Sequence, residues 1–138
     1  MSQENVEIVR DGLERFLADR DTSRLADDFV WDVTHFEGWP DKAVYNGVDE
    51  FNDFVAMWFE PFDEWRQEIE RVEDLGGDRV LAIAHQHARL KGSTAEVDLR
   101  YAIVYTVEGE HVTVGDVYVP VERAFEAVGL TDRRADAP

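Results

Sequence analysis

The stretch Val80-Leu81-Ala82-Ile83-Ala84-His85-Gln86-His87-Ala88 decides how the fold of this chain is interpreted. Its nearly continuous apolar residues predict a β-strand that is buried on both faces. Side chains at positions i and i+2 of a strand share a face, so His85 and His87 lie side by side. Because imidazole titrates near neutral pH, binds metals and transfers protons, this pair is the first candidate for function.

Helical periodicity occurs mainly before this stretch. The spacing of apolar residues and the turn and cap residues predict helices over 3–19, 23–28 (a short second helix), 48–60 and 121–128. Pro61 ends the third of these helices, and Gly129 closes the last. Alternating or continuous apolar runs predict strands over 29–35, 65–72, 79–90, 96–107 and 111–119.

The resulting order is α-α-β-α-β-β-β-β-α. Helices followed by an antiparallel meander are typical of the α+β class. We expect a cone-shaped, curved antiparallel sheet wrapped around the N-terminal helices and the long third helix, with a pocket inside. Residues 1–130 are predicted to form one domain, and residues 131–138 a polar C-terminal tail.

The amino-acid composition of the chain limits the kinds of molecule that it can be expected to bind. The 138 residues are 44% hydrophobic, which suits a single packed domain, and the absence of cysteine excludes disulfides and thiolate chemistry. Thirty-one acidic and 14 basic residues give a net charge of −17, which disfavours nucleic acid and anionic membranes. No spanning run of about 18 apolar residues occurs. The expected location is the cytoplasm, with no membrane or nucleic-acid partner.

The strand pattern also predicts which face of the sheet is covered by the helices and which by a second copy of the chain. One face is expected to carry the two histidines together with Leu81, Ile83, Leu99, Tyr101, Ile103 and Tyr105. The opposite face is expected to carry smaller residues, Val80, Ala82, Ala84, Ala102, Val104, Val112, Val114 and Tyr118. Since the helices can cover only one face, we expect a second copy to cover the flatter, convex face in a homodimer. The face with rings and histidines is expected to line the pocket.

Several short stretches, in their order and spacing, resemble the nuclear transport factor 2-like superfamily and within it the SnoaL-like, or polyketide cyclase-like, branch. The matching stretches are Asn5-Val6-Glu7-Ile8-Val9-Arg10, Val30-Trp31-Asp32, Val44-Tyr45-Asn46-Gly47, Glu60-Pro61-Phe62-Asp63 and Ala124-Phe125-Glu126-Ala127-Val128-Gly129-Leu130. The resemblance covers nearly the whole chain. It implies a cystatin-like α+β barrel, commonly dimeric, with a central cavity, in a superfamily of both enzymes and non-catalytic proteins.

Two enzymes of the superfamily supply patterns that can be compared position by position. A ketosteroid isomerase mechanism needs carboxyl and phenol groups where this chain has Val33, about Gly12, and Ile103, so the sequence argues against that mechanism. A limonene epoxide hydrolase has arginine and aspartate at the positions that match His85 and His87. Its other aspartate falls near Val117, one residue from Asp116. A slip of one residue reverses the face, so Asp116 is either a pocket acid or an outward group.

The candidate catalytic residues are therefore His85 and His87 as proton shuttles, His35 as a second base, Tyr101 as a hydrogen-bond donor, and Asp116. The residues expected to contact a ligand are Trp31, Val33, Trp39, Trp58, Ile83, Leu99, Ile103, Tyr105 and Val117. For the histidine pair, a non-catalytic polar patch and a metal site remain alternatives. A metal site needs a third ligand, and only His35 is expected nearby, because His111 follows a turn. No metal or other cofactor is predicted.

The predicted function is a small-molecule pocket protein with lyase, isomerase or cyclase activity on an apolar, ring-like substrate. The expected aromatic and aliphatic lining supports this substrate class. Two alternatives are a non-catalytic ligand-binding domain and a dimerisation module whose core is filled by its own side chains.

Overall fold

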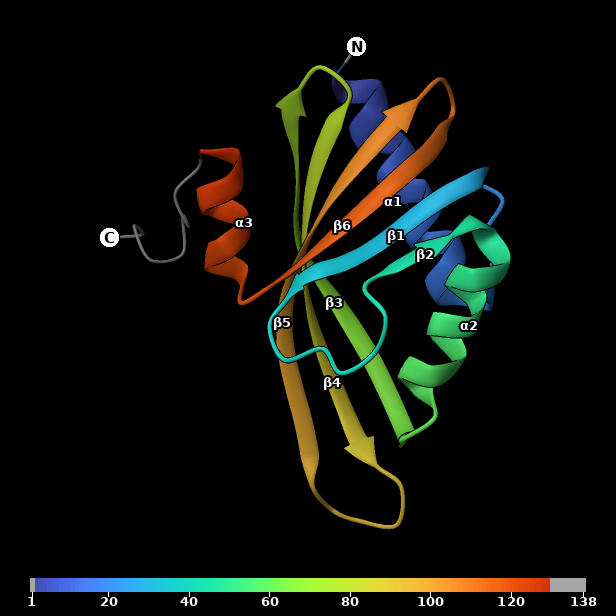
Figure 1. Cartoon of the computed structure of the whole chain (residues 1–138), viewed down its shortest axis with the longest axis vertical. Helices are drawn as coiled ribbons and strands as arrows, with labels where there is room; N and C mark the ends of the chain where they lie inside the picture. The colour runs from blue at the N-terminus through green and yellow to red at the C-terminus, as the bar shows by residue number, and fades with distance from the viewer. Residues whose placement is uncertain (1, 130–138) are drawn as a thin grey trace.

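A long, curved sheet organises the chain, and the computed structural model describes it over residues 2–129 (Figure 1). In this part of the chain the helices are α1 (Ser2–Asp19), α2 (Gly47–Phe59) and α3 (Val121–Val128). The strands are β1 (Leu25–Phe36), β2 (Val44–Asn46), β3 (Phe62–Gly76), β4 (Arg79–Leu90), β5 (Glu96–Glu108) and β6 (His111–Val119). The predicted polar tail, residues 131–138, lies outside the described residues.

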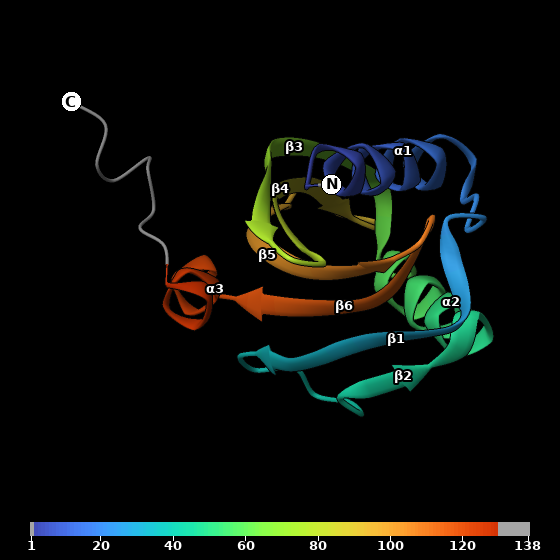
Figure 2. The ribbon, with the colours of Figure 1, turned by 90° about the horizontal axis from the view of Figure 1, so that it is seen from above.

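The strands are arranged in the order β2-β1-β6-β5-β4-β3. Strands β1 and β6 run parallel, whereas every other neighbouring pair is antiparallel. Seen from above, the sheet curves around α1 and α2, and α3 lies on its outer side (Figure 2). The α+β class and the curved sheet are confirmed. The sheet is not closed, and among residues 2–129 no helix is both long and apolar enough to cross a membrane.

The predicted short helix over 23–28 is wrong, because Leu25 to Asp28 form the beginning of β1. A helix of this length has little stability of its own, whereas pairing with another strand provides hydrogen bonds for the backbone N–H and C=O groups. Leu25 is paired with Val112 of β6, and its N–H donates to the Thr22 carbonyl at 2.9 Å. The predicted loop before α2 also contains β2, which places Tyr45 opposite Trp31.

Two apolar cores fill the two sides of the sheet. The larger core lies on the concave side and joins α1 and α2 to inward side chains such as Phe29, Val80 and Ile103. The smaller core lies on the convex side, where α3 packs on β4 and β5. Its members are Leu81, Ile83, Ala102, Val104, Val121, Ala124 and Phe125.

This arrangement corrects the predicted cover of the convex face. Val80 and Ala82 belong to the concave core, and the buried apolar residues of the convex side, such as Ala102 and Val104, lie under α3 of the same chain. The part of the convex face carried by Glu68, His87 and Asp98 is polar and partly exposed. Much of the apolar surface that we expected a second copy to cover is therefore buried within the chain itself.

Gly115 on β6 provides the space for Trp31 at the centre of the concave core. A Cβ atom added at Gly115 would lie 2.8 Å from two carbon atoms of the Trp31 ring, closer than van der Waals contact allows. Trp31 is itself packed edge-on against Phe51, with ring centroids 5.1 Å apart. The indole therefore has little freedom to move away.

We expect Gly115→Ala to lower the free energy of unfolding by about 1–3 kcal/mol, the usual cost of overpacking a core. Urea unfolding followed by circular dichroism measures it. In a double variant that also carries Trp31→Leu, the alanine should cost much less than in the wild-type background, because the smaller side chain leaves room for it. An equal cost in both backgrounds would contradict this account of the packing.

Candidate functional site

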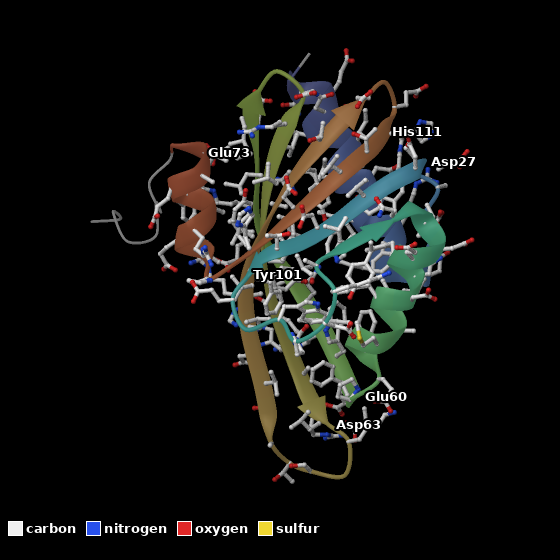
Figure 3. All side chains as sticks on the ribbon, viewed as in Figure 1. Asp27, Glu60, Asp63, Glu73, Tyr101 and His111 are labelled. Carbon is white, nitrogen blue, oxygen red and sulfur yellow. The ribbon has the colours of Figure 1, made fainter. Side chains whose placement is uncertain are left out.

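A cavity of about 110 Å³ lies between α1, α2 and the concave face of the sheet. Nearly half of its lining residues are aromatic, and most of the others are aliphatic. The aromatic ones are Phe16, Phe29, Trp31, Phe36, Phe51, Phe54, Trp58, Phe59, Trp65, Tyr101 and Tyr105. Helix α2 supplies Phe51, Phe54 and Trp58 from one face, because residues three and four apart share a helix face. Figure 3 places Tyr101 near the middle of the molecule.

Gln86 is the buried polar residue behind this lining, with 1% of its surface exposed. Its Oε1 accepts hydrogen bonds from the indole Nε1 of Trp58 and of Trp65, both at 2.8 Å. Trp58 lies on α2 and Trp65 on β3, so one amide oxygen ties the helix to the sheet. Both indoles line the cavity, and Gln86 therefore fixes the orientation of its wall. Gln86 was not among the residues predicted from the sequence, although it is the centre of the His-Gln-His stretch.

Tyr101 supplies a second polar point, since its hydroxyl donates to Oε1 of Gln67 on β3. Burial raises the pKa of Tyr101, and the neighbouring Tyr105 raises it further. Burial also raises the pKa of Tyr105. Both phenols are consequently neutral across the physiological range. Among the described residues, the buried Nε1 of Trp31 has no hydrogen-bond partner, so this cavity-lining indole can still donate to an acceptor.

Charged lining residues come from the connection between α1 and β1. Arg24 and Asp21 both contribute to the cavity wall there. The guanidinium of Arg24 is engaged by Asp11, with 2.8 Å between Nε and Oδ2, and by the Glu110 carbonyl at 3.1 Å. Its charge is therefore compensated before any ligand binds.

The structure brings many of the predicted ligand-contacting residues to the cavity and leaves others outside. Trp31, Trp58, Ile103, Tyr105, Val117 and the proposed donor Tyr101 line it. The remaining four, Val33, Trp39, Ile83 and Leu99, lie outside its lining. Val33 is buried in the concave core, and Trp39 packs behind Trp58 with its Nε1 donating to the Lys42 carbonyl. Ile83 lies on the opposite face, under α3.

The expected inward direction of His85 and His87 is wrong. Paired residues of neighbouring strands share a face, and β5 pairs Leu99 with Gln86 and Tyr101 with Ala84. The histidines are instead opposite Arg100 and Asp98 on the convex face. The prediction placed the odd-numbered residues of both strands on one face, whereas the register pairs odd with even positions. A shift of one residue reverses every side chain.

His35 also points away from the cavity, because a β-bulge between Asp32 and His35 changes the alternation of β1. Its ring stacks on Tyr118, with 4.9 Å between centroids and an interplanar angle of 1°. Phe36, the next residue, lines the cavity instead.

Of the two directions predicted for Asp116, into the pocket or outward, the structure shows the outward one. Asp116 is paired with Val104, a member of the core under α3, and lies beside Asp32 on the neighbouring strand. Partial burial raises the pKa of the Asp116 carboxyl, and the negative charge of Asp32 raises it further. Among the described residues, no histidine lines the cavity, and its acidic lining is limited to Asp21.

Comparison with known proteins agrees with this architecture. A family model described as a SnoaL-like domain matches residues 9–114. A candidate SnoaL-like polyketide cyclase from Jannaschia sp. superposes with a TM-score of 0.69 at 18% identity, and the match covers 95% of each chain. TerC, co-crystallised with polyporic acid, gives a TM-score of 0.70 at 17% identity over 91% of this chain and 98% of its own.

A third structure is a hypothetical protein with a ketosteroid isomerase-like fold from Catenulispora acidiphila, solved in complex with trimethylamine. It gives a TM-score of 0.67 at 17% identity and covers 91% of this chain and 94% of its own. At these identities the solved structures establish the fold. Comparison with the curated proteins found no match.

Replacing Gln86 by leucine should lower the free energy of unfolding by about 2 kcal/mol or more. The change keeps the approximate volume but removes the acceptor of two indole N–H groups, and each partly buried donor left unpaired costs about 1–3 kcal/mol. Denaturant unfolding measures the loss, and the tryptophan emission spectrum should change with it. Gln3→Leu, on the exposed surface of α1, is the control. A Gln86→Leu protein as stable as this control would contradict the bridging role.

The raised pKa of Asp116 predicts a pH-dependent effect of Asp116→Asn. A carboxyl whose folded-state pKa lies above its unfolded value stabilises the fold fully only below the unfolded pKa, and this contribution is lost as pH rises through the folded value. At pH 7 the asparagine variant should be more stable than the wild type by up to about 1 kcal/mol, since the group is half-exposed. The gain should vanish toward pH 3. Thermal unfolding across pH tests this, and a variant that is less stable at pH 7 would contradict it.

Proposed function

The chain belongs to the SnoaL-like domain family, and from that premise we propose that it binds a small, neutral, apolar molecule in the cavity. The observation that carries the proposal is the aromatic wall with only a few polar groups, the usual composition of a small-molecule site. A dimerisation module with a filled core would leave no such space. Relatives of this fold crystallised with polyporic acid and with trimethylamine support an organic ligand.

The cavity volume limits the size of the ligand. A volume of about 110 Å³ is below the roughly 150 Å³ of an engineered cavity that holds benzene. The ligand that fits without movement of the wall is therefore a single small ring or a short branched chain. A polycyclic molecule would require Trp58 or Phe59, at the partly exposed end of α2, to move outward.

The polar groups of the wall define the chemistry of the ligand. Trp31 offers an unpartnered N–H, and the neutral Tyr101 hydroxyl can exchange its bond to Gln67 for one to a ligand. Both are donors, so the favoured ligand carries one or two acceptor oxygens, such as a carbonyl or an ether. An ionised carboxylate is disfavoured because Arg24, the cation within the described lining, is already paired with Asp11.

We propose binding ahead of catalysis because His85, His87, His35 and Asp116 do not line the cavity. Lyase, isomerase or cyclase activity at this site would rest on Tyr101 as the group that polarises a ligand oxygen. The proposed cellular location is the cytoplasm. A homodimer stays a prediction, and the mass in solution decides it.

Binding of a neutral single-ring ketone, such as cyclohexanone, to the full chain tests the proposal. Calorimetric titration or ligand-detected NMR should show saturable binding that Val117→Phe abolishes by filling the cavity. Val114→Phe adds the same bulk on β6 outside the lining and should leave binding unchanged. Tyr101→Phe should weaken binding of the ketone about fivefold, the value of one net hydrogen bond, but not that of methylcyclohexane.

Equal binding to the Val117→Phe and Val114→Phe proteins would place the ligand elsewhere and overturn the assignment of this cavity. Circular dichroism of both variants establishes that each is folded before the comparison is made.

A further inference from the structure

A polar cluster on the convex face lies directly behind the cavity wall. It consists of Glu68 on β3, His85 and His87 on β4, and Asp98 on β5. The register places Glu68 opposite His85, and His87 opposite Asp98. The two imidazole rings have centroids 4.1 Å apart. Adjacent strands hold these groups, so their backbone positions are fixed by the sheet.

The distances suit a shared metal ion. One ligand atom each from His85, His87 and Asp98 lies within 4.8 Å of the other two. Nδ1 of His87 is 3.1 Å from Oδ1 of Asp98. A tetrahedral site with bonds of about 2.0 Å requires ligand atoms about 3.3 Å apart, close to this separation. The ligand atoms that lie farther apart than this can approach one another by side-chain rotation, because His85 and His87 are only partly buried and Asp98 is exposed.

The second nitrogen of His87 also fits a metal site. Its Nε2 lies 3.4 Å from Oε1 of Glu68, and among residues 2–129 this buried atom makes no hydrogen bond. Metal-binding histidines commonly present their other ring nitrogen to a carboxylate, which fixes the tautomer and the ring orientation. Glu68 is held in place by Arg66, with 2.8 Å between the paired atoms.

The charges around the cluster favour a cation. Arg100, which is opposite His85, is paired with Glu70 at 2.9 Å, so its positive charge is compensated. The chain carries a net charge of −17. Two imidazoles with one carboxylate select zinc-like transition metals over Mg²⁺ and Ca²⁺, which prefer oxygen ligands.

We propose that His85, His87 and Asp98 bind one divalent transition-metal ion of the zinc class on the convex face, with Glu68 orienting His87. Three protein ligands leave a fourth position for water or an external ligand. The site is separate from the cavity and does not depend on the function proposed for it. His35, the third ligand considered from sequence, is stacked on Tyr118 of β6 and is replaced by Asp98.

The test uses the full-length, untagged chain after treatment with a chelator. Titration calorimetry with Zn²⁺ should give one ion per chain, and Co²⁺ should give the visible absorption of a tetrahedral site. His87→Gln and Asp98→Asn should each weaken Zn²⁺ binding by more than 100-fold. Glu68→Gln should weaken it by about 10–100-fold, as expected for a residue that only orients a ligand.

His111→Gln is the matched control, because His111 is an exposed histidine at the turn between β5 and β6 (Figure 3). It should bind Zn²⁺ as the wild type does, and circular dichroism should show all variants folded. The proposal is overturned by an absence of stoichiometric Zn²⁺ binding, or by binding that His87→Gln and Asp98→Asn leave unchanged. Displacement of Zn²⁺ by a similar concentration of Mg²⁺ would also overturn the proposal, because it would indicate diffuse attraction of cations to the acidic surface.

Discussion

The register of β4 between β3 and β5 is the constraint on which the rest of the structure depends. It turns Gln86 inward, where one amide oxygen accepts from two indoles that would otherwise lack an acceptor. The same register turns His85 and His87 outward, toward carboxylates on both neighbouring strands. A slip of one residue would place two imidazoles against the aromatic wall and expose the amide, so the polar groups of both faces would lose their partners.

Sequence periodicity was sufficient for the class of fold and for most elements, because amphipathic helices and long apolar strands carry strong local signals. The faces of β4 could not be assigned in this way. Alternation identifies a face only when one side is polar, and here Val80, Leu81, Ala82 and Ile83 are all buried. Which residues of β4 and β5 share a face is set by the connection between them, and that connection contains no turn whose geometry is unambiguous from sequence.

Other differences arose where tertiary contacts override local preference. The segment beginning at Leu25 is predicted as a helix but pairs with β6, a strand more than 80 residues later in the sequence. No local sequence pattern indicates that pairing. The bulge in β1 similarly redirects His35, while Trp31 and Val33 keep the predicted inward direction. The aromatic lining was easier to anticipate, since large rings in amphipathic positions are buried wherever a core forms.

Neighbouring residues of β4 belong to different sites, because alternate side chains of a strand point to opposite faces of the sheet. Gln86 supports the cavity from one face, and the adjacent histidines belong to the convex cluster on the other. Their chemistry is separated by the thickness of the sheet, although they are neighbours in sequence. A histidine motif in a strand that is apolar on both faces therefore identifies a functional region without identifying its side. Here the buried glutamine indicates the side, because its amide oxygen accepts from Trp58 and Trp65, and both of these indoles line the cavity.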